Sequence, residues 1–169
     1  ACRHCWIAPN FEHSDRSQKA LPFDLFKKII TEAKEAGLSG VKLTGGEPFI
    51  HPDIIPILRY IRDQKLRLTI ESNGTAITSH HADLIKSCPG AFISVSIDGG
   101  CESHEWMRGV KGSFDRASQG VKTLVETGIH PQVIMAVAGR NKDEMAELAR
   151  YAQELGASSV KYNFVTPTA

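Results

Sequence analysis

The sequence has no long hydrophobic run and no excess of one charge. Its longest apolar runs are the length of a strand, such as residues 92–97 and 133–138, and none approaches the ~20 residues that cross a membrane. The chain carries 20 basic and 19 acidic residues, a net charge of +1. Such a balance offers no electrostatic attraction for nucleic acid or for an anionic membrane surface, so we expect neither as a partner.

Cysteine is also scarce, with four residues in 169. Cys2 and Cys5 form a Cys-x-x-Cys pair, whereas Cys88 and Cys101 are not spaced as a second pair. This pattern does not predict a disulfide framework, and a zinc site would need two further ligands. Two thiolates separated by two residues can bind one soft metal centre from a single loop. We therefore expect a reduced, cytoplasmic setting and a metal-binding role for Cys2 and Cys5.

Apolar residues recur at helical spacing in some segments and form short runs in others, which predicts alternating helices and strands. We expect helices at residues 22–36, 53–63, 78–86, 113–126 and 141–155, strands at 40–44, 66–71, 91–97, 130–138 and 158–164, and loops at 6–20 and 101–112. Regular alternation of this kind favours an α/β fold, with a parallel sheet and outer helices. At 169 residues and 41% hydrophobic composition, the chain fits one domain, residues 1–169.

The segment Gly45-Gly46-Glu47-Pro48 follows the first predicted strand. Two glycines after a strand often form only a tight turn. They also allow the backbone to approach a ligand closely, and Glu47 then offers a carboxylate to an ammonium group. In barrel folds the C-terminal ends of the strands carry the chemistry, so this position favours a binding role.

Polar residues lie in or directly after the next two predicted strands. Asn73 lies in a Ser-Asn-Gly segment, which is a common turn but is also suited to line a site. Ser94, Ser96 and Asp98 are spaced two residues apart and therefore share one face of their strand. Polar side chains inside a barrel are costly without partners, so a ligand is expected beside them.

These motifs, together with Trp6 after the second cysteine and with His104 and Arg108-Gly109 after Asp98, resemble the radical S-adenosylmethionine (SAM) superfamily. The likeness is to the branch that contains molybdenum-cofactor enzymes and SPASM-type peptide-modifying enzymes. It implies a partial (β/α)6 TIM-like barrel whose first strand lies before this chain, so that residues 1–169 are a core fragment truncated at both ends. It further implies a [4Fe–4S] cluster bound by Cys2, by Cys5 and by a first cysteine four residues before Cys2.

The resemblance also implies the cofactor site and the reaction. The residues expected to bind SAM are Gly45, Gly46, Glu47, Pro48, Asn73, Ser96, Asp98 and Arg108. A reduced cluster would cleave SAM to a 5′-deoxyadenosyl radical, which abstracts hydrogen from a peptide or small-molecule substrate. The electron would come from a donor such as flavodoxin or ferredoxin.

Two other functions stay open from the residues alone. A zinc- or thiol-bearing binding module would use the cysteine pair without catalysis. A non-redox (β/α)-barrel enzyme would use Glu47, Asp98 and His104 as acid–base groups. The SAM-dependent hypothesis predicts that Glu47, Asn73, Ser96 and Asp98 converge on one cleft beside the cysteine pair, at the rim where parallel strands end.

Overall fold

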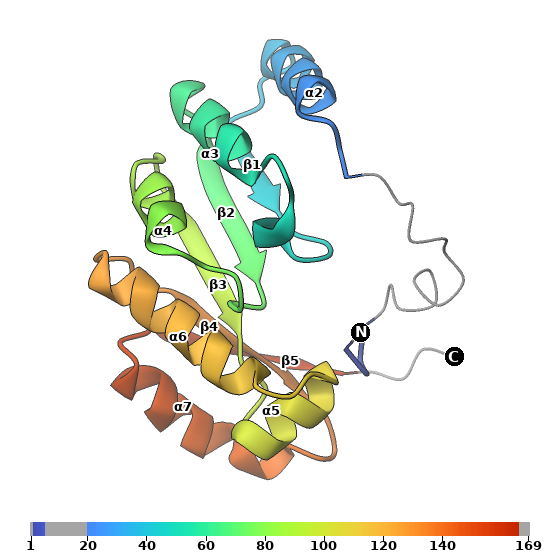
Figure 1. Cartoon of the computed structure of the whole chain (residues 1–169), viewed down its shortest axis with the longest axis vertical. Coiled ribbons are helices and arrows are strands. Elements are labelled where there is room, and N and C mark those ends of the chain that lie inside the picture. Colours follow the sequence, from blue (N-terminus) through green and yellow to red (C-terminus); the bar gives the residue numbers. More distant parts are fainter. Residues whose placement is uncertain (1, 6–19, 166–169) are drawn as a thin grey trace.

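A computed structural model describes residues 2–5 and 20–165 of the chain (Figure 1). Nearly all of the expected loop at 6–20, with Trp6, lies outside these residues. The strands are β1 (Gly40–Leu43), β2 (Arg67–Ser72), β3 (Phe92–Ser96), β4 (Gln132–Val137) and β5 (Ser159–Phe164). The α-helices are α2 (Phe23–Glu35), α3 (Ile54–Asp63), α4 (Ser79–Lys86), α5 (Cys101–Arg108), α6 (Ser113–Glu126) and α7 (Met145–Glu154), and the short 3-10 helices are η1 (Pro48–Ile50) and η2 (Lys142–Glu144).

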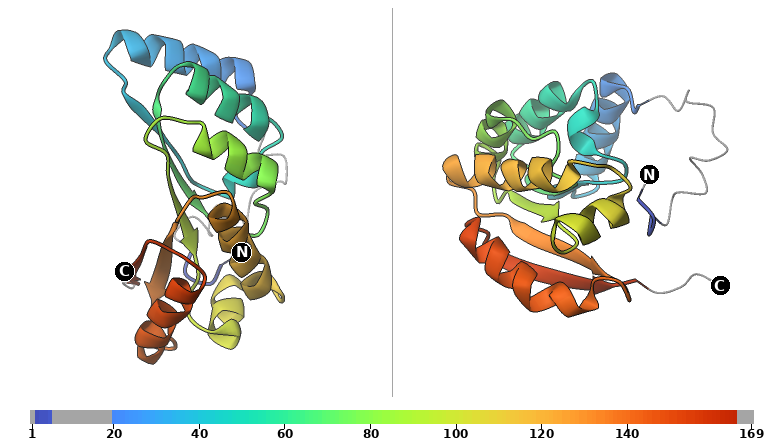
Figure 2. Two further views of the ribbon diagram at one scale, coloured as in Figure 1. Left: turned by 90° about the vertical axis from the view of Figure 1, so that its left-hand side faces the viewer. Right: turned by 60° about the horizontal axis from the view of Figure 1, so that its bottom comes forward.

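The five strands form one parallel sheet in the order β1-β2-β3-β4-β5, so each strand pairs with the next in sequence. Figures 1 and 2 show the sheet curved, with the helices that connect the strands on its outer face. This is the α/β arrangement of a partial barrel, and it confirms the expected fold class.

Alternating residues divide the strands between two faces. Leu68 and Ile70 of β2 and Val95 of β3 are fully buried and belong to the apolar core under the helices. Their sequence neighbours occupy the opposite, inner face, where Glu71 pairs with Ser94 across the two strands. The outer face therefore holds the core, and the inner face carries polar groups.

The prediction of a loop at 101–112 is wrong for most of this segment, because its first eight residues form α5. The segment is mostly polar, with a single buried apolar side chain, Met107, so apolar spacing gave no helical signal. Instead α5 buries the polar residues Ser103 and His104. Gly109 ends the helix in the left-handed conformation, with φ 66°. The helix lies at the end of the sheet where the strands terminate (Figure 1).

The other predicted elements are present, with small shifts at their ends. The helix expected at 141–155 begins as the 3-10 turn η2 before α7. Thr78 caps α4 and accepts a hydrogen bond from the backbone N–H of His81, as in a capping box. Within the described part of the chain, no helix is long and apolar enough to cross a membrane.

Candidate functional site

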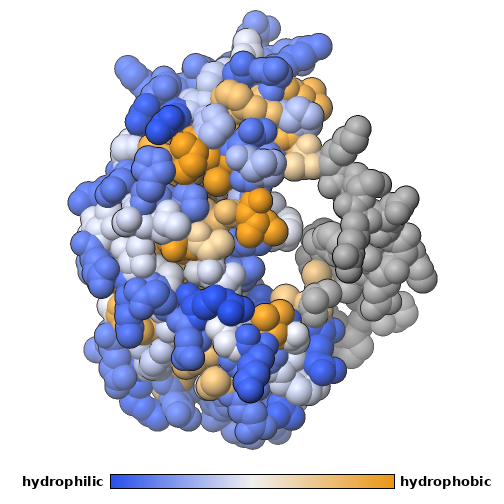
Figure 3. All heavy atoms as spheres, in the orientation of Figure 1, coloured by the Kyte–Doolittle hydropathy of each residue, from blue (hydrophilic) through white to orange (hydrophobic). Residues whose placement is uncertain are grey.

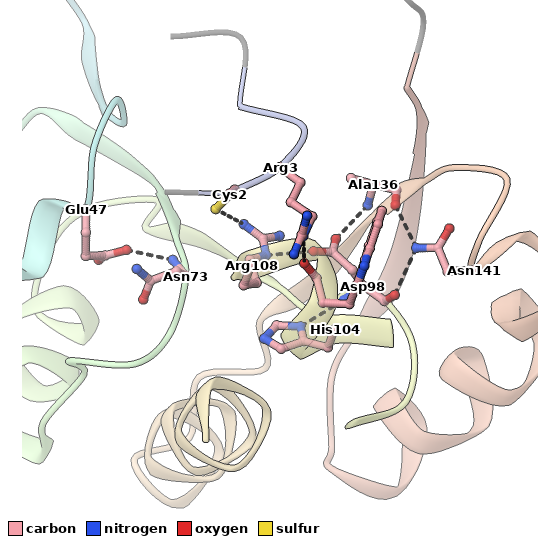
Figure 4. A network of polar contacts seen from close by, with 10 residues as sticks. Cys2, Arg3, Glu47, Asn73, Asp98, His104, Arg108, Ala136 and Asn141 are labelled. Carbon is pink, nitrogen blue, oxygen red and sulfur yellow. Dashed lines mark hydrogen bonds and ion pairs between the residues drawn. The ribbon is translucent and has the colours of Figure 1, made fainter. Parts of the chain in front are cut away.

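The Glu47 carboxylate joins the ends of β1 and β2. Its Oε1 accepts hydrogen bonds from the Ser72 hydroxyl at 2.8 Å and from the Phe49 N–H at 3.1 Å. Its Oε2 accepts from the Asn73 N–H at 2.7 Å (Figure 4). A carboxylate offers about four acceptor positions, so one remains for a ligand donor.

The two glycines before Glu47 face open space. Gly45 has a φ of 117°, a conformation that favours glycine. A Cβ atom added to Gly45 or Gly46 would meet no atom within 4 Å, so nothing in the described packing requires a small residue at Gly46. The open space is compatible with a ligand lying against this backbone.

The Ser72-Asn73-Gly74 turn packs closely against β3 and α6. Gly74 has a φ of 79°, and a Cβ atom at this position would lie 2.6 Å from a methyl carbon of Val95. A Cβ atom on Gly120 of α6 would collide with the carbonyl oxygen of Gly74. The Asn73 side-chain oxygen accepts from the N–H and hydroxyl of Thr75 at 2.8 and 2.7 Å. These contacts hold Asn73 at the end of β2.

Asp98 is fully buried at the end of β3 and contacts four residues (Figure 4). Its Oδ1 accepts from the Ala136 N–H at 2.9 Å, and its Oδ2 lies 2.6 Å from Arg108 Nε. Its backbone N–H donates to Nδ1 of His104 at 3.1 Å. The side chain of Asn141 donates to the carbonyl oxygens of Asp98 and Ala136, both at 2.9 Å. Asp98 therefore joins β3, β4 and α5 at the rim of the sheet.

This network sets the charge of its members. Burial, followed by the nearby Arg108 charge, lowers the pKa of His104 to about 4, so the imidazole is neutral at pH 7. Burial also acts to lower the pKa of Arg108, but the Asp98 carboxylate and the Cys2 thiol outweigh it and raise that pKa above its ordinary value. The network thus pairs the permanent cation Arg108 with a buried carboxylate, beside a neutral histidine.

The cysteine segment, residues 2–5, docks on the C-terminal end of α5. The Arg3 N–H donates to the carbonyl of Met107 at 2.8 Å, and Arg3 Nε donates to the carbonyl of Trp106 at 2.9 Å. The Arg3 guanidinium also stacks 4.7 Å from the centre of the Trp106 ring. Arg108 Nη1 donates to Cys2 Sγ at 3.7 Å (Figure 4). The helix that the sequence did not predict therefore positions the cysteines.

A cavity of about 230 Å³ lies where these groups meet. Figure 3 shows the surface hollowed on this side of the molecule, between η1 and α5. The residues that line it are Cys2, Asn73, Thr75, His104, Arg108, Val110, Ser113 and Arg116. Glu47 bonds to the backbone of Asn73 and Asp98 pairs with Arg108, so both support the cavity wall.

The remaining expected residues lie elsewhere. Pro48 begins η1 and lines a different, largely apolar cavity between α2 and α3. Ser96 is half-buried on the inner face, in register with Ile134. Thr75, Arg116 and Asn141 were missed by sequence reasoning, because only tertiary packing brings them to the rim.

The donor set suits an iron–sulfur cluster only in part. Cys2 and Cys5 are half-buried thiols in one turn, closed by a hydrogen bond from the Cys5 N–H to the Cys2 carbonyl at 3.1 Å. Across residues 2–5 and 20–165, no three His, Cys, Asp or Glu side chains are grouped to hold a metal. Two thiolates are one short of the three that bind a [4Fe–4S] cluster, as expected if a further cysteine precedes Cys2. The described residues also form no complete zinc site, which would need four ligands.

Comparison with known proteins gives consistent matches. The sequence model of the radical SAM superfamily matches residues 1–152. The AdoMet-dependent heme synthase of Methanosarcina barkeri (strain Fusaro / DSM 804) is 33% identical over 99% of this chain and 47% of its own length. The antilisterial bacteriocin subtilosin biosynthesis protein AlbA of Bacillus subtilis (strain 168) is 31% identical over 97% of this chain and 36% of its own length.

The fold is similar to that of Streptococcus suis SuiB bound to the precursor peptide SuiA. The TM-score is 0.82 at 20% identity, over 98% of this chain and 36% of SuiB. The chain thus spans less than half the length of each of these proteins.

Proposed function

This chain belongs to the radical SAM superfamily, whose members use a [4Fe–4S] cluster and SAM, and we propose that residues 1–169 form the core domain of such an enzyme. One observation carries the proposal: Cys2, Asn73 and Arg108 line a single cavity, with Glu47 and Asp98 bonded to its wall. When bound, the two cofactors supply a 5′-deoxyadenosyl radical that removes hydrogen from a substrate.

Cys2 and Cys5 would hold the cluster, together with a third thiolate from outside the chain. Arg108 would keep a positive charge against the Cys2 sulfur, and Asp98 would fix its orientation. Arg3 and Trp106 would hold the loop in place through their stacking contact. The protein therefore supplies two sulfur ligands and a nearby cation, which favours added negative charge on the cluster.

Gly45, Gly46 and Glu47 would bind the amino end of SAM. The glycine backbone is open, and Glu47 retains an acceptor position for an ammonium group. Asn73 and Arg116 lie in the cavity wall with donors that suit the SAM carboxylate. Ser96, on the inner face, would bind the ribose. Asp98 and Arg108 support the site in this arrangement, because each already has a charged partner.

The substrate would be a peptide or a small molecule, delivered to the inner face of the sheet. Relatives of both kinds match the chain, since one is named for heme synthesis and another for the production of a bacteriocin. Reduction would come from a donor such as flavodoxin or ferredoxin, in a reduced cytoplasmic setting.

The test is metal analysis of the full-length protein after anaerobic reconstitution. We expect four iron and four sulfide per cluster site, and an EPR signal of the reduced cluster that changes when SAM is added. Cys5→Ala should lose the iron and the signal, whereas the matched control Cys101→Ala, an exposed thiol on α5, should keep both. Zinc without iron would instead identify a binding module, and a metal-free active enzyme would identify a non-redox barrel.

A further inference from the structure

A charged cluster lies on the inner face of the sheet, on residues of β1, β2 and β5. Lys42 of β1 forms an ion pair with Glu71 of β2, with Nζ 2.8 Å from Oε1. The Thr44 hydroxyl donates to the other carboxylate oxygen of Glu71 at 3.2 Å. Both oxygens of the only carboxylate in this cluster are therefore engaged.

Lys161 of β5 belongs to the same face. It pairs in register with Ile134 of β4, which pairs with Ser96 of β3. The hydrogen bond from Lys42 is the largest cause of the lowered pKa of Glu71, and the charge of Lys161 adds to it. Because the sheet is curved, Lys161 on one edge strand acts across the inner face toward Glu71.

The cluster has more positive than negative charge. Two ammonium groups, Lys42 and Lys161, accompany one carboxylate, which leaves a net charge of +1. Lys161 is exposed and has no ion pair or side-chain hydrogen bond within the described residues. The apolar Ile134 lies in register beside Lys161, and the uncharged polar residues on this face include Thr69, Ser94, Ser96, Gln132 and Asn163.

We propose that the inner face binds one carboxylate of the substrate between Lys42 and Lys161. A single carboxylate neutralises the net charge of the cluster, whereas a phosphate dianion would leave it negative. The mostly polar surroundings suit a hydrophilic group. Identification of the ligand as the substrate rests on the proposed function, but the binding of a carboxylate does not.

The experiment measures binding by calorimetry to the full-length protein at low salt. The peptide probe is acetyl-tetraglutamate amide, with acetyl-tetraglutamine amide as its uncharged counterpart. The small-molecule probe is glutarate, with glutaramide as its counterpart. We expect the acidic probe of at least one pair to bind more tightly than its amide. The pair that does so identifies a peptide or a small acid as the source of the carboxylate.

Three variants test the location. Lys161→Gln should weaken binding of the acidic probe about fivefold, the effect of an exposed ion pair. Glu71→Gln should strengthen binding by a similar factor, because it raises the net charge of the cluster. Lys122→Gln, an exposed lysine on α6 at the outer face, is the matched control and should change nothing. Thermal unfolding of each variant shows that the fold is retained.

The proposal is overturned if neither acid binds better than its amide, or if Lys161→Gln behaves like Lys122→Gln. It is also overturned if Lys161→Gln lowers SAM affinity and leaves the probes unaffected, since Lys161 would then serve the cofactor. Iron content and SAM binding of the parent protein are measured on the same samples. If the parent protein contains no iron and does not bind SAM but still binds the acidic probe, the proposed function is contradicted and the carboxylate site is retained.

Discussion

The guanidinium of Arg108 donates to the sulfur of Cys2 over 3.7 Å. The same side chain places Nε 2.6 Å from the buried carboxylate of Asp98. A residue of the cysteine pair and the end of β3 are thus linked through one arginine on α5, a helix that carries little apolar patterning.

We expect Arg108→Gln to shift the midpoint potential of the cluster to a more negative value, because a positive charge beside a sulfur ligand favours the reduced state. The variant should also lose about 3 kcal/mol of stability, since Asp98 would remain buried without its charged partner. An EPR-monitored redox titration and denaturant unfolding measure the two effects. Arg59→Gln, an exposed arginine on α3, is the control. Equal potentials in both variants would show that Arg108 serves only the fold.

Glu47→Ala should weaken SAM binding roughly ten- to a hundredfold, the loss of a hydrogen bond to a charged group. It should also reduce stability, because Glu47 accepts hydrogen bonds from Ser72, Asn73 and Phe49. Glu47→Gln separates the two effects, since its amide keeps one acceptor oxygen but no charge. Calorimetry should find weaker SAM binding in both variants. A Gln variant with the parent's affinity would rule out an ammonium contact.

Gly120→Ala should destabilise the protein by about 1–3 kcal/mol, the usual effect of overpacking. The added methyl group would collide with the Gly74 carbonyl and displace the turn that carries Asn73. SAM affinity should fall with stability. Gly139→Ala is the control, because a Cβ atom there meets nothing within 4 Å. Thermal unfolding distinguishes the two, and equal stability would contradict the close packing of α6 on the turn.

His104 should make the cluster-free protein sensitive to acid. Its pKa is about 4 when folded and 6.5 in the unfolded reference, so the unfolded chain binds the proton more readily between these values. The contribution of neutral His104 to the free energy of unfolding is therefore fully present above about pH 6.5. It is lost as the pH drops toward 4, by about 3 kcal/mol in total.

His104→Gln should make the free energy of unfolding less dependent on pH, because glutamine does not titrate. Its amide oxygen can still accept the hydrogen bond from the Asp98 N–H. Urea unfolding between pH 4 and 7 makes the comparison. His4 and His81 also have lowered pKa values and contribute in the same direction, so only the difference between parent and variant reports on His104. Parallel curves for the two proteins would exclude its contribution.

Sequence reasoning recovered the parallel α/β fold because apolar periodicity and glycine stops mark most elements. It missed α5 because that helix buries Ser103 and His104 along with a single apolar residue, Met107. The motifs indicated the rim where strands end, since Glu47, Asn73 and Asp98 all follow strands. They could not reveal that the Glu47 carboxylate joins two strand ends, nor that Asn141 ties Asp98 to β4. Those contacts depend on strand order and curvature, which have no local signal.

Formation of 5′-deoxyadenosine is the most direct test of the assignment to SAM-dependent radical chemistry. The full-length protein, reconstituted with iron and sulfide under anaerobic conditions and reduced with dithionite, should convert SAM to 5′-deoxyadenosine and methionine. Cys5→Ala should form neither product, and Cys101→Ala should form both. A cluster-loaded parent protein that forms no 5′-deoxyadenosine, or equal product from parent and Cys5→Ala, would contradict the assignment.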